Sequence, residues 1–200
     1  MKILITAFDP FGGESTNPSW KAIKNLNIEN LYIVELPTSF EKAPKLLIDK
    51  IEEIKPDIVF SIGQAGGRSK ISIELVGINL MDAKLADNDG YKPNQIKIRE
   101  DGDDAYFSTL DTFDIVENLK SHNIPAFVSL SAGAYVCNSV LYTALHYSKV
   151  NNLNYKAAFM HVPYISEQVI DKPSNAPYMD LKDIERAVKI IIEYLKKDER

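Results

Sequence analysis

Cysteine is scarce in this sequence of 200 residues. The single cysteine excludes an internal disulfide and a cysteine-rich metal site, which leaves Cys137 a role in packing or in chemistry. The chain also lacks any cluster of lysine and arginine, and its net charge is −5. A surface that binds nucleic acid needs such a cluster, so we expect no nucleic-acid partner.

Long hydrophobic runs are missing as well. The apolar run before Asp9 and Pro10 has about six residues, too few for the apolar region of a signal peptide or for a membrane span. We therefore expect an unprocessed cytoplasmic protein without membrane contact. The chain has no low-complexity tract, repeat or Ser/Gly-rich linker, so we expect residues 1–200 to form one domain around one core.

Apolar runs of strand length alternate with helical patterns along the chain. Branched and aromatic residues predict strands at 2–7, 31–36, 57–62, 71–81, 125–130 and 157–162. Helical spacing predicts helices at 18–26, 40–54, 111–121 and 135–149, and a closing amphipathic helix behind a cap at Asp180. Continuous apolar strands alternating with helices indicate a largely parallel sheet covered on both faces. The predicted fold class is α/β with three α/β/α layers, and the polar stretch 86–104 is a loop or a small hairpin.

Two glycine-bearing turns follow predicted strands, at 10–15 (PFGGES) and 63–68 (GQAGGR). Neither matches the GxxxxGK[ST] or GxGxxG patterns that hold phosphates, so a nucleotide- or phosphate-binding module is only a remote alternative. Ligands of open α/β sheets bind beyond the carboxyl ends of the strands. Both turns are therefore candidate walls of a site.

Cys137 lies at the start of the predicted helix 135–149, where a helix N-terminus stabilises a thiolate and lowers its pKa. His161 ends the apolar strand at 157–162, where a general base can meet a cysteine from a neighbouring element. Each has an ordinary alternative, a small buried apolar residue for Cys137 and a hydrogen-bonded core histidine for His161. His122 and His146 are expected to be structural.

Glu74 interrupts an otherwise apolar strand, and a carboxylate is costly to bury there without a partner. It either faces outward on an edge strand or faces the site. In the second case it accepts a hydrogen bond from one ring nitrogen of His161 and leaves the other nitrogen to take the proton of Cys137.

Several segments, in this order, resemble one known family. They are FDPFGGESTNPSW, LPTSF, KPDIVFSIGQAGGR, AYFSTL, SAGAYVCN and MHVPYISEQV, and together they run through nearly the entire chain. The sequence resembles the pyrrolidone-carboxylate peptidases, also called pyroglutamyl peptidases of type I. The resemblance implies a cysteine peptidase that removes an N-terminal pyroglutamyl residue from peptides, without metal or cofactor.

The same resemblance assigns site residues. It implies that Cys137 is the nucleophile, His161 the base and Glu74 the residue that orients the base. The family's aromatic loop implies that Phe8 and Phe11 pack on the flat lactam ring. Polar contacts come from Asn17 and from the backbone near Gln64. The family also implies a homo-oligomer, a tetramer by analogy.

Three positions depart from the pattern of the family. Leu75 and Lys84 stand where arginine is common, and Ala7 replaces a usual glycine. Because lysine and leucine cannot reproduce the bidentate contacts of arginine, a catalytically weakened or altered-specificity member that binds a small lactam or amide is the main alternative.

Overall fold

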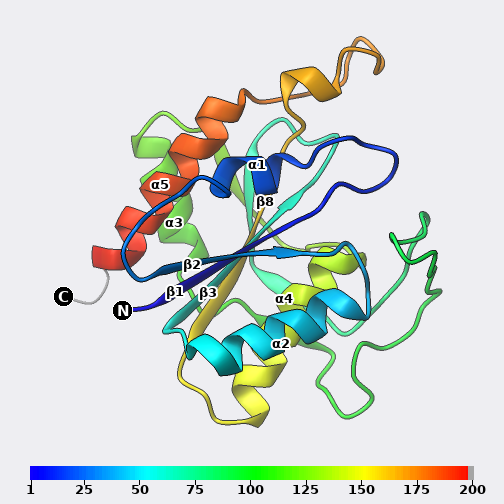
Figure 1. Ribbon diagram of the computed structural model, residues 1–200, viewed down its shortest axis with the longest axis vertical. Coiled ribbons are helices and arrows are strands. Elements are labelled where there is room, and N and C mark those ends of the chain that lie inside the picture. Colours follow the sequence, from blue (N-terminus) through cyan, green and yellow to red (C-terminus); the bar gives the residue numbers. More distant parts are fainter. Residues whose placement is uncertain (198–200) are drawn as a thin grey trace.

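Six strands form the central sheet of the computed structural model, which describes residues 1–197 (Figure 1). Their order is β2-β1-β3-β8-β4-β7, and every neighbouring pair is parallel except β4 with β8. The predicted, largely parallel sheet is confirmed. The strands are β1 (Ile3–Phe8), β2 (Leu31–Leu36), β3 (Ile58–Gln64), β4 (Ile71–Glu74), β7 (Ala126–Ser129) and β8 (Lys156–Val162).

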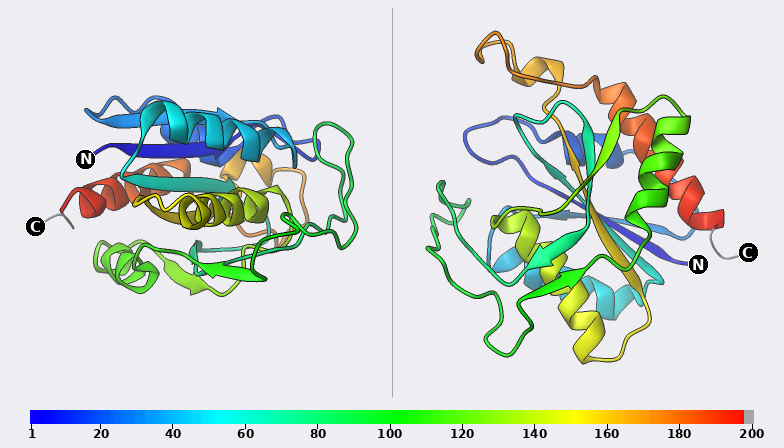
Figure 2. Two further views of the ribbon diagram at one scale, coloured as in Figure 1. Left: turned by 90° about the horizontal axis from the view of Figure 1, so that it is seen from below. Right: turned by 180° about the vertical axis from the view of Figure 1, so that it is seen from behind.

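Helices cover both faces of this sheet, as predicted (Figures 1 and 2). One face packs on α2 (Lys42–Ile54) and α4 (Val136–Val150), and the other packs on α1 (Pro18–Ile23), α3 (Thr112–Ser121) and α5 (Leu181–Lys197). In α5 the apolar positions spaced three or four apart are buried against the sheet, which explains the amphipathic pattern. Among residues 1–197, no helix is long and apolar enough to cross a membrane.

The predicted strand at 71–81 is wrong as a single element. The chain leaves the central sheet after Glu74, and β5 (Val76–Ile78) pairs instead with β6 (Ala105–Phe107) in a separate antiparallel ribbon. Leu75 marks the break, because its N–H donates to Ser129 O while its carbonyl accepts from Ser108 N. The stretch 86–104 is a loop, as expected, and an isolated bridge joins Ile96 in it to Met81.

The carboxyl ends of β1, β3 and β8 meet at one edge of the sheet, because these strands are neighbours and parallel. The turn at 65–70 carries the chain past the end of β8, and β4 then runs back antiparallel beside it. A turn this short cannot make the long crossover that a parallel strand requires. Residues from β3, β4 and β8 are thereby brought together at one edge.

Candidate active site

A cavity of about 370 Å³ opens at this edge of the sheet. It is lined by residues from the ends of β1, β3 and β8, from the segments that follow β1, β2, β3 and β7, and from the start of α4. The lining residues are Phe8, Phe11, Asn17, Thr38, Gln64, Ala65, Arg68, Ser131, Ala132, Gly133, Tyr135, Cys137 and His161. The cavity therefore brings Cys137 and His161 together with all four residues expected on the substrate side.

Cys137 lies in the first turn of α4. The residue at the N-cap is Tyr135, and no side chain caps the helix, although Ser, Thr, Asp or Asn is usual at this position. Asn138, the one amide nearby, instead binds the backbone of Ile78 and Leu80. The first N–H groups of α4 therefore lie beside the sulfur without a capping side chain.

His161 lies on β8 directly opposite Gly63 on β3. A side chain at Gly63 would collide with its surroundings, because an added Cβ would lie 2.7 Å from Cys137 Sγ and 2.8 Å from Phe159 Cζ. The absence of a side chain at Gly63 thus makes room for the sulfur beside the strand that carries His161.

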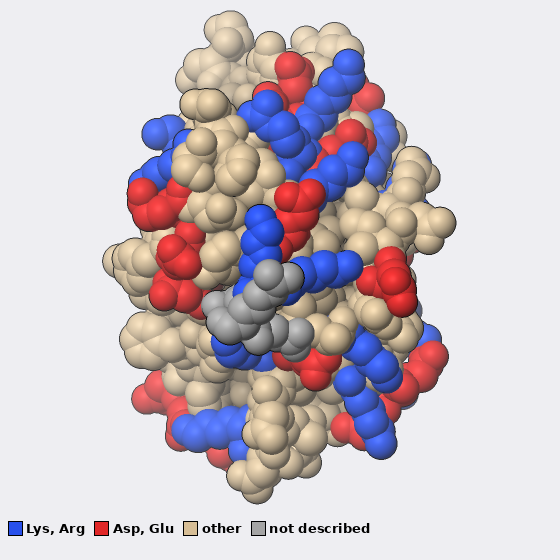
Figure 3. Space-filling model, turned by 90° about the vertical axis from the view of Figure 1, so that its left-hand side faces the viewer, with Lys and Arg blue, Asp and Glu red and all other residues tan. Residues whose placement is uncertain are grey.

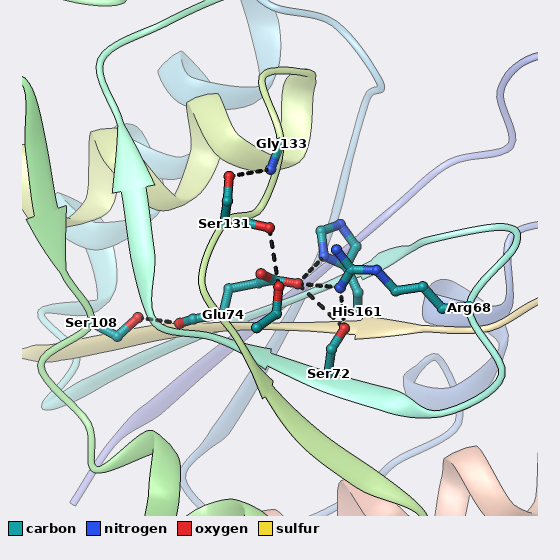
Figure 4. Close-up of polar contacts among 8 residues, drawn as sticks. Arg68, Ser72, Glu74, Ser108, Ser131, Gly133 and His161 are labelled. Atoms are coloured by element: carbon teal, nitrogen blue, oxygen red, sulfur yellow. Dashed lines mark hydrogen bonds and ion pairs between the residues drawn. The ribbon is translucent and has the colours of Figure 1, made fainter.

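Glu74 is fully buried and binds His161, as Figure 4 shows. Its Oε1 lies 2.7 Å from His161 Nδ1. A carboxylate only accepts, so His161 carries a proton on Nδ1 and presents Nε2 as an acceptor. The outward-facing alternative for Glu74 is excluded by its burial.

The same carboxylate oxygen has two further donors. Arg68 Nη1 lies 2.6 Å from Glu74 Oε1 and also donates to Ser72 Oγ, while Ser72 Oγ lies 3.3 Å from Glu74 Oε1. Figure 4 shows Arg68 and His161 converging on Glu74. These partners compensate a charge that would be costly to bury alone.

The pKa values of Glu74 and Cys137 are shifted in opposite directions. Burial alone would raise the pKa of Glu74, but hydrogen bonds from His161 and Ser129, the electrostatic effect of His161 and the charge of Arg68 lower this pKa below its ordinary value. For Cys137 burial raises the pKa, and the charge of Glu74 adds to this effect. The backbone N–H of Cys137 and the charge of Arg68 act in the opposite direction but are smaller.

The prediction that the helix N-terminus lowers the pKa of Cys137 is therefore wrong, because this pKa is raised. Burial removes the thiolate from water, and this raises the pKa of Cys137 more than the backbone N–H of Cys137 and the charge of Arg68 lower it. Burial therefore favours the neutral thiol of Cys137.

Aromatic side chains form one wall of the cavity. Phe8 ends β1 and packs against Phe159 with ring centroids 6.2 Å apart, and Phe11 packs against Tyr135 at 5.9 Å. Tyr135 also meets the ring of Phe40, edge to face. Flat rings at these positions suit a flat apolar ligand group.

The side chains of Asn17 and Gln64 are engaged within the protein, whereas the contact expected near Gln64 was with the backbone. Asn17 Oδ1 accepts from Ser19 as the N-cap of α1, and its Nδ2 donates to Asp9 O at 2.9 Å. Gln64 Oε1 accepts from Gln168 Nε2 at 2.8 Å. Both residues line the cavity, and their contacts fix the shape of its wall.

Sequence reasoning named the turn at 63–68 as a candidate wall but did not single out Gly63 or Arg68 within it, and it missed Thr38, Tyr135 and the segment 131–133. A signal existed for Arg68, because a buried Glu74 requires a cation and Arg68 ends the turn before β4. The positions that depart from the family pattern lie elsewhere: neither Leu75 nor Lys84 lines the cavity, and Ala7 is buried in β1.

The other two histidines lie outside the cavity. His122 is exposed at the end of α3, and His146 is buried in α4, where it stacks on Tyr142 and contacts Tyr106. Over residues 1–197, no group of three or more His, Cys, Asp or Glu side chains is arranged to hold a metal ion.

Comparisons with known proteins agree on one family. The model of the family described as pyroglutamyl peptidase matches residues 1–198. A pyrrolidone-carboxylate peptidase of Caldanaerobacter subterraneus is 53% identical over 201 residues, covering 96% of this chain and 98% of the relative. A mutant pyrrolidone carboxyl peptidase of Pyrococcus furiosus superposes with a TM-score of 0.94 at 40% identity over 100% of both chains. The enzyme of Fervidobacterium islandicum gives a TM-score of 0.95 at 38% identity, over 98% of this chain and 99% of the other.

Proposed function

We propose, because the chain belongs to the pyroglutamyl peptidase family, that it removes an N-terminal pyroglutamyl residue from peptides with Cys137, His161 and Glu74 as its catalytic set. The family is one of cysteine-type hydrolases. The observation that carries the residue assignment is the 2.7 Å contact between His161 Nδ1 and Glu74 Oε1, in a cavity that also holds the only cysteine of the chain.

The acylation step begins with His161 as general base. Cys137 Sγ gives its proton to His161 Nε2 and attacks the pyroglutamyl carbonyl carbon, and the carbonyl electron pair moves to oxygen. Backbone N–H groups at the uncapped start of α4 stabilise this oxyanion. When the oxyanion collapses, the C–N bond breaks and His161 protonates the leaving amine, which leaves a thioester on Cys137.

Water then releases the product. His161 takes a proton from water as the water oxygen attacks the thioester, the C–S bond breaks, and the proton returns to the sulfur. Glu74 accepts a hydrogen bond from His161 Nδ1 throughout and stabilises the imidazolium that forms in each step. The cycle uses side chains, backbone and water, and free pyroglutamate leaves.

Selectivity for pyroglutamate follows from what the cavity offers. Phe8, Phe11 and Tyr135 provide flat surfaces for an uncharged lactam ring. Of the described residues that line the cavity, none is an aspartate or glutamate. A free α-ammonium group would lose its hydration there without gaining a carboxylate partner, so ordinary N-termini are rejected by the cost of desolvation.

The test is release of a fluorescent amine from a pyroglutamyl amide. The wild-type protein should release the amine from this amide and not from the matching prolyl amide, whose ring carries a charged nitrogen. Cys137→Ala should be folded and inactive. A folded wild-type protein without turnover would contradict the activity, and equal turnover of the prolyl amide would contradict the account of selectivity.

The oligomeric state, the cellular location and the partners of the enzyme are further parts of the proposal. We propose a cytoplasmic homo-oligomer, a tetramer by family analogy, and exposed Phe107, Leu130 and Ile170 are candidate contact residues. Acidic and basic side chains are interspersed on the face in Figure 3, which supports peptides over nucleic acid as partners. Light scattering gives the oligomeric state, and cell fractionation gives the location.

A further inference from the structure

Arg68 is a cation that lines the candidate active site, and no step of the proposed reaction uses it directly. Its side chain lines the cavity with 29% of its surface exposed, at the end of the turn between β3 and β4. The guanidinium lies 5.9 Å from the centre of the Phe127 ring, so an aromatic face supports it on one side. Glu74 and Ser72 hold it on the other.

The guanidinium of Arg68 and the ring of His161 contact the same oxygen of Glu74. Arg68 Nη1 and His161 Nδ1 lie 2.6 and 2.7 Å from the same Oε1 of Glu74. Ser72 lies opposite His161 in the register of β4 and β8, and its Oγ donates to the same oxygen of Glu74. Because Arg68 Nη1 and Ser72 Oγ both donate to Oε1 of Glu74, they limit rotation of the carboxylate, and His161 inherits that orientation.

We propose that Arg68 is a positioning residue of the peptidase reaction, which holds Glu74 for His161 and tunes the charge balance around Cys137. This inference rests on the proposed function for its consequence on turnover. The placement of the guanidinium against Glu74 carries it independently of the reaction.

The direction of the electrostatic effect follows from the groups that face one another. The pKa of Cys137 responds to the charge of Glu74 on β4 and to the charge of Arg68 on the turn, whereas the pKa of Glu74 responds to His161 on β8 and to Arg68. Removing a nearby positive charge raises the pKa of every titrating neighbour. Loss of Arg68 therefore makes Cys137 harder to ionise and moves the pH profile of thiolate formation to higher pH.

The first experiment measures alkylation of the thiol by iodoacetamide against pH. Because the chain has one cysteine, the rate reports on Cys137 alone. In Arg68→Met the midpoint of the alkylation profile should rise by roughly half a pH unit or more. Arg68→Lys keeps the charge and should stay near the wild type. Arg186→Met, which removes an exposed arginine of α5 with a loose ion pair to Asp183, should leave the midpoint unchanged.

The second readout is turnover of the pyroglutamyl amide. Arg68→Met should lower kcat about tenfold or more, because a displaced base loses alignment. Arg68→Lys should recover part of kcat. If Arg68→Met fails to fold, Arg68→Gln keeps a donor for Glu74 without the charge and takes its place.

The outcomes separate this inference from the proposed function. A folded Arg68→Met or Arg68→Gln variant with the wild-type alkylation midpoint and the wild-type kcat overturns the role of Arg68, even if the wild type hydrolyses the amide. A wild-type protein that does not hydrolyse the amide, but shows the expected alkylation shifts, overturns the peptidase and leaves the placement of Arg68 standing.

Discussion

Gly63 and His161 lie opposite each other on β3 and β8, and the missing side chain of Gly63 admits the sulfur of Cys137 to the surface beside His161. The sulfur comes from α4 on the covering layer, so its approach depends on a gap in the sheet face. A glycine at the carboxyl end of a buried strand supplies that gap. This glycine belongs to the geometry of the proposed catalytic site although it carries no reactive group.

Gly63→Ala should lower kcat/KM about a hundredfold. The added methyl group would lie within 3 Å of Cys137 Sγ and of the Phe159 ring, so the sulfur must move away from its place. Steady-state hydrolysis of a pyroglutamyl amide measures the loss.

The matched control is Gly90→Ala in the loop 86–104. Gly90 has a φ of +82° and nothing within 4 Å of an added Cβ, so alanine there costs about 1 kcal/mol of stability through backbone strain alone. Its kcat/KM should remain that of the wild type. An unimpaired Gly63→Ala would contradict the account of how the sulfur is admitted.

Glu74→Gln should reduce kcat about a hundredfold or more and change KM little. The amide keeps the shape of the carboxylate but loses the charge that stabilises imidazolium, and it can donate to His161 and favour the wrong tautomer. Comparison with Ser72→Ala, which removes one weaker donor at 3.3 Å, should show a much smaller loss. Equal losses in the two variants would count against the orienting role of Glu74.

The lowered pKa of Glu74 also predicts how the free energy of unfolding changes at acid pH. Its pKa in the folded protein lies below the ordinary value of 4.5, so the unfolded chain binds this proton more readily. The contribution of Glu74 to the free energy of unfolding is therefore complete above that value and is lost as pH falls through the folded pKa. Urea unfolding should show that the stability of the wild type relative to Glu74→Gln declines as pH is lowered from neutral to below about 4. A constant difference would contradict the lowered pKa.

Asn17 distinguishes a wall residue from a substrate contact. Asn17→Ala removes the cap of α1 and should cost about 1 kcal/mol of stability, with a raised KM because the neighbouring Phe8 and Phe11 lose support. Asn17→Ser retains a capping oxygen and should restore stability and most of KM. A stable Asn17→Ser with the full rise in KM would show instead that the amide binds substrate directly.

Much of the fold follows from period and composition, and the exceptions have physical reasons. Buried parallel strands are continuous apolar runs, so β1, β3 and β8 were predicted close to their observed positions, and the partly exposed edge strand β2 was predicted at 31–36, where it lies. The run 71–81 is equally apolar, but pattern alone does not show that the chain changes sheets at Leu75. That break depends on hydrogen bonds to Ser129 and Ser108, which are distant in the sequence.

The site was less accessible to sequence reasoning than the fold. Resemblance led to Cys137, His161 and Glu74, but the role of Gly63 depends on register between strands that are distant in the sequence. The raised pKa of Cys137 depends on burial by the surrounding layers, whereas the sequence showed only the favourable helix N-terminus. Both effects arise from tertiary packing.

The most direct measurement is the mass of the protein after rapid acid quenching during hydrolysis of a pyroglutamyl ester, which acylates the sulfur faster than an amide. The account predicts a species heavier by one pyroglutamyl group, with the added mass on the peptide that contains Cys137, and its absence in Cys137→Ala. Turnover that continues in Cys137→Ala, or an acyl group found on another residue, would contradict the assignment of Cys137 as the nucleophile.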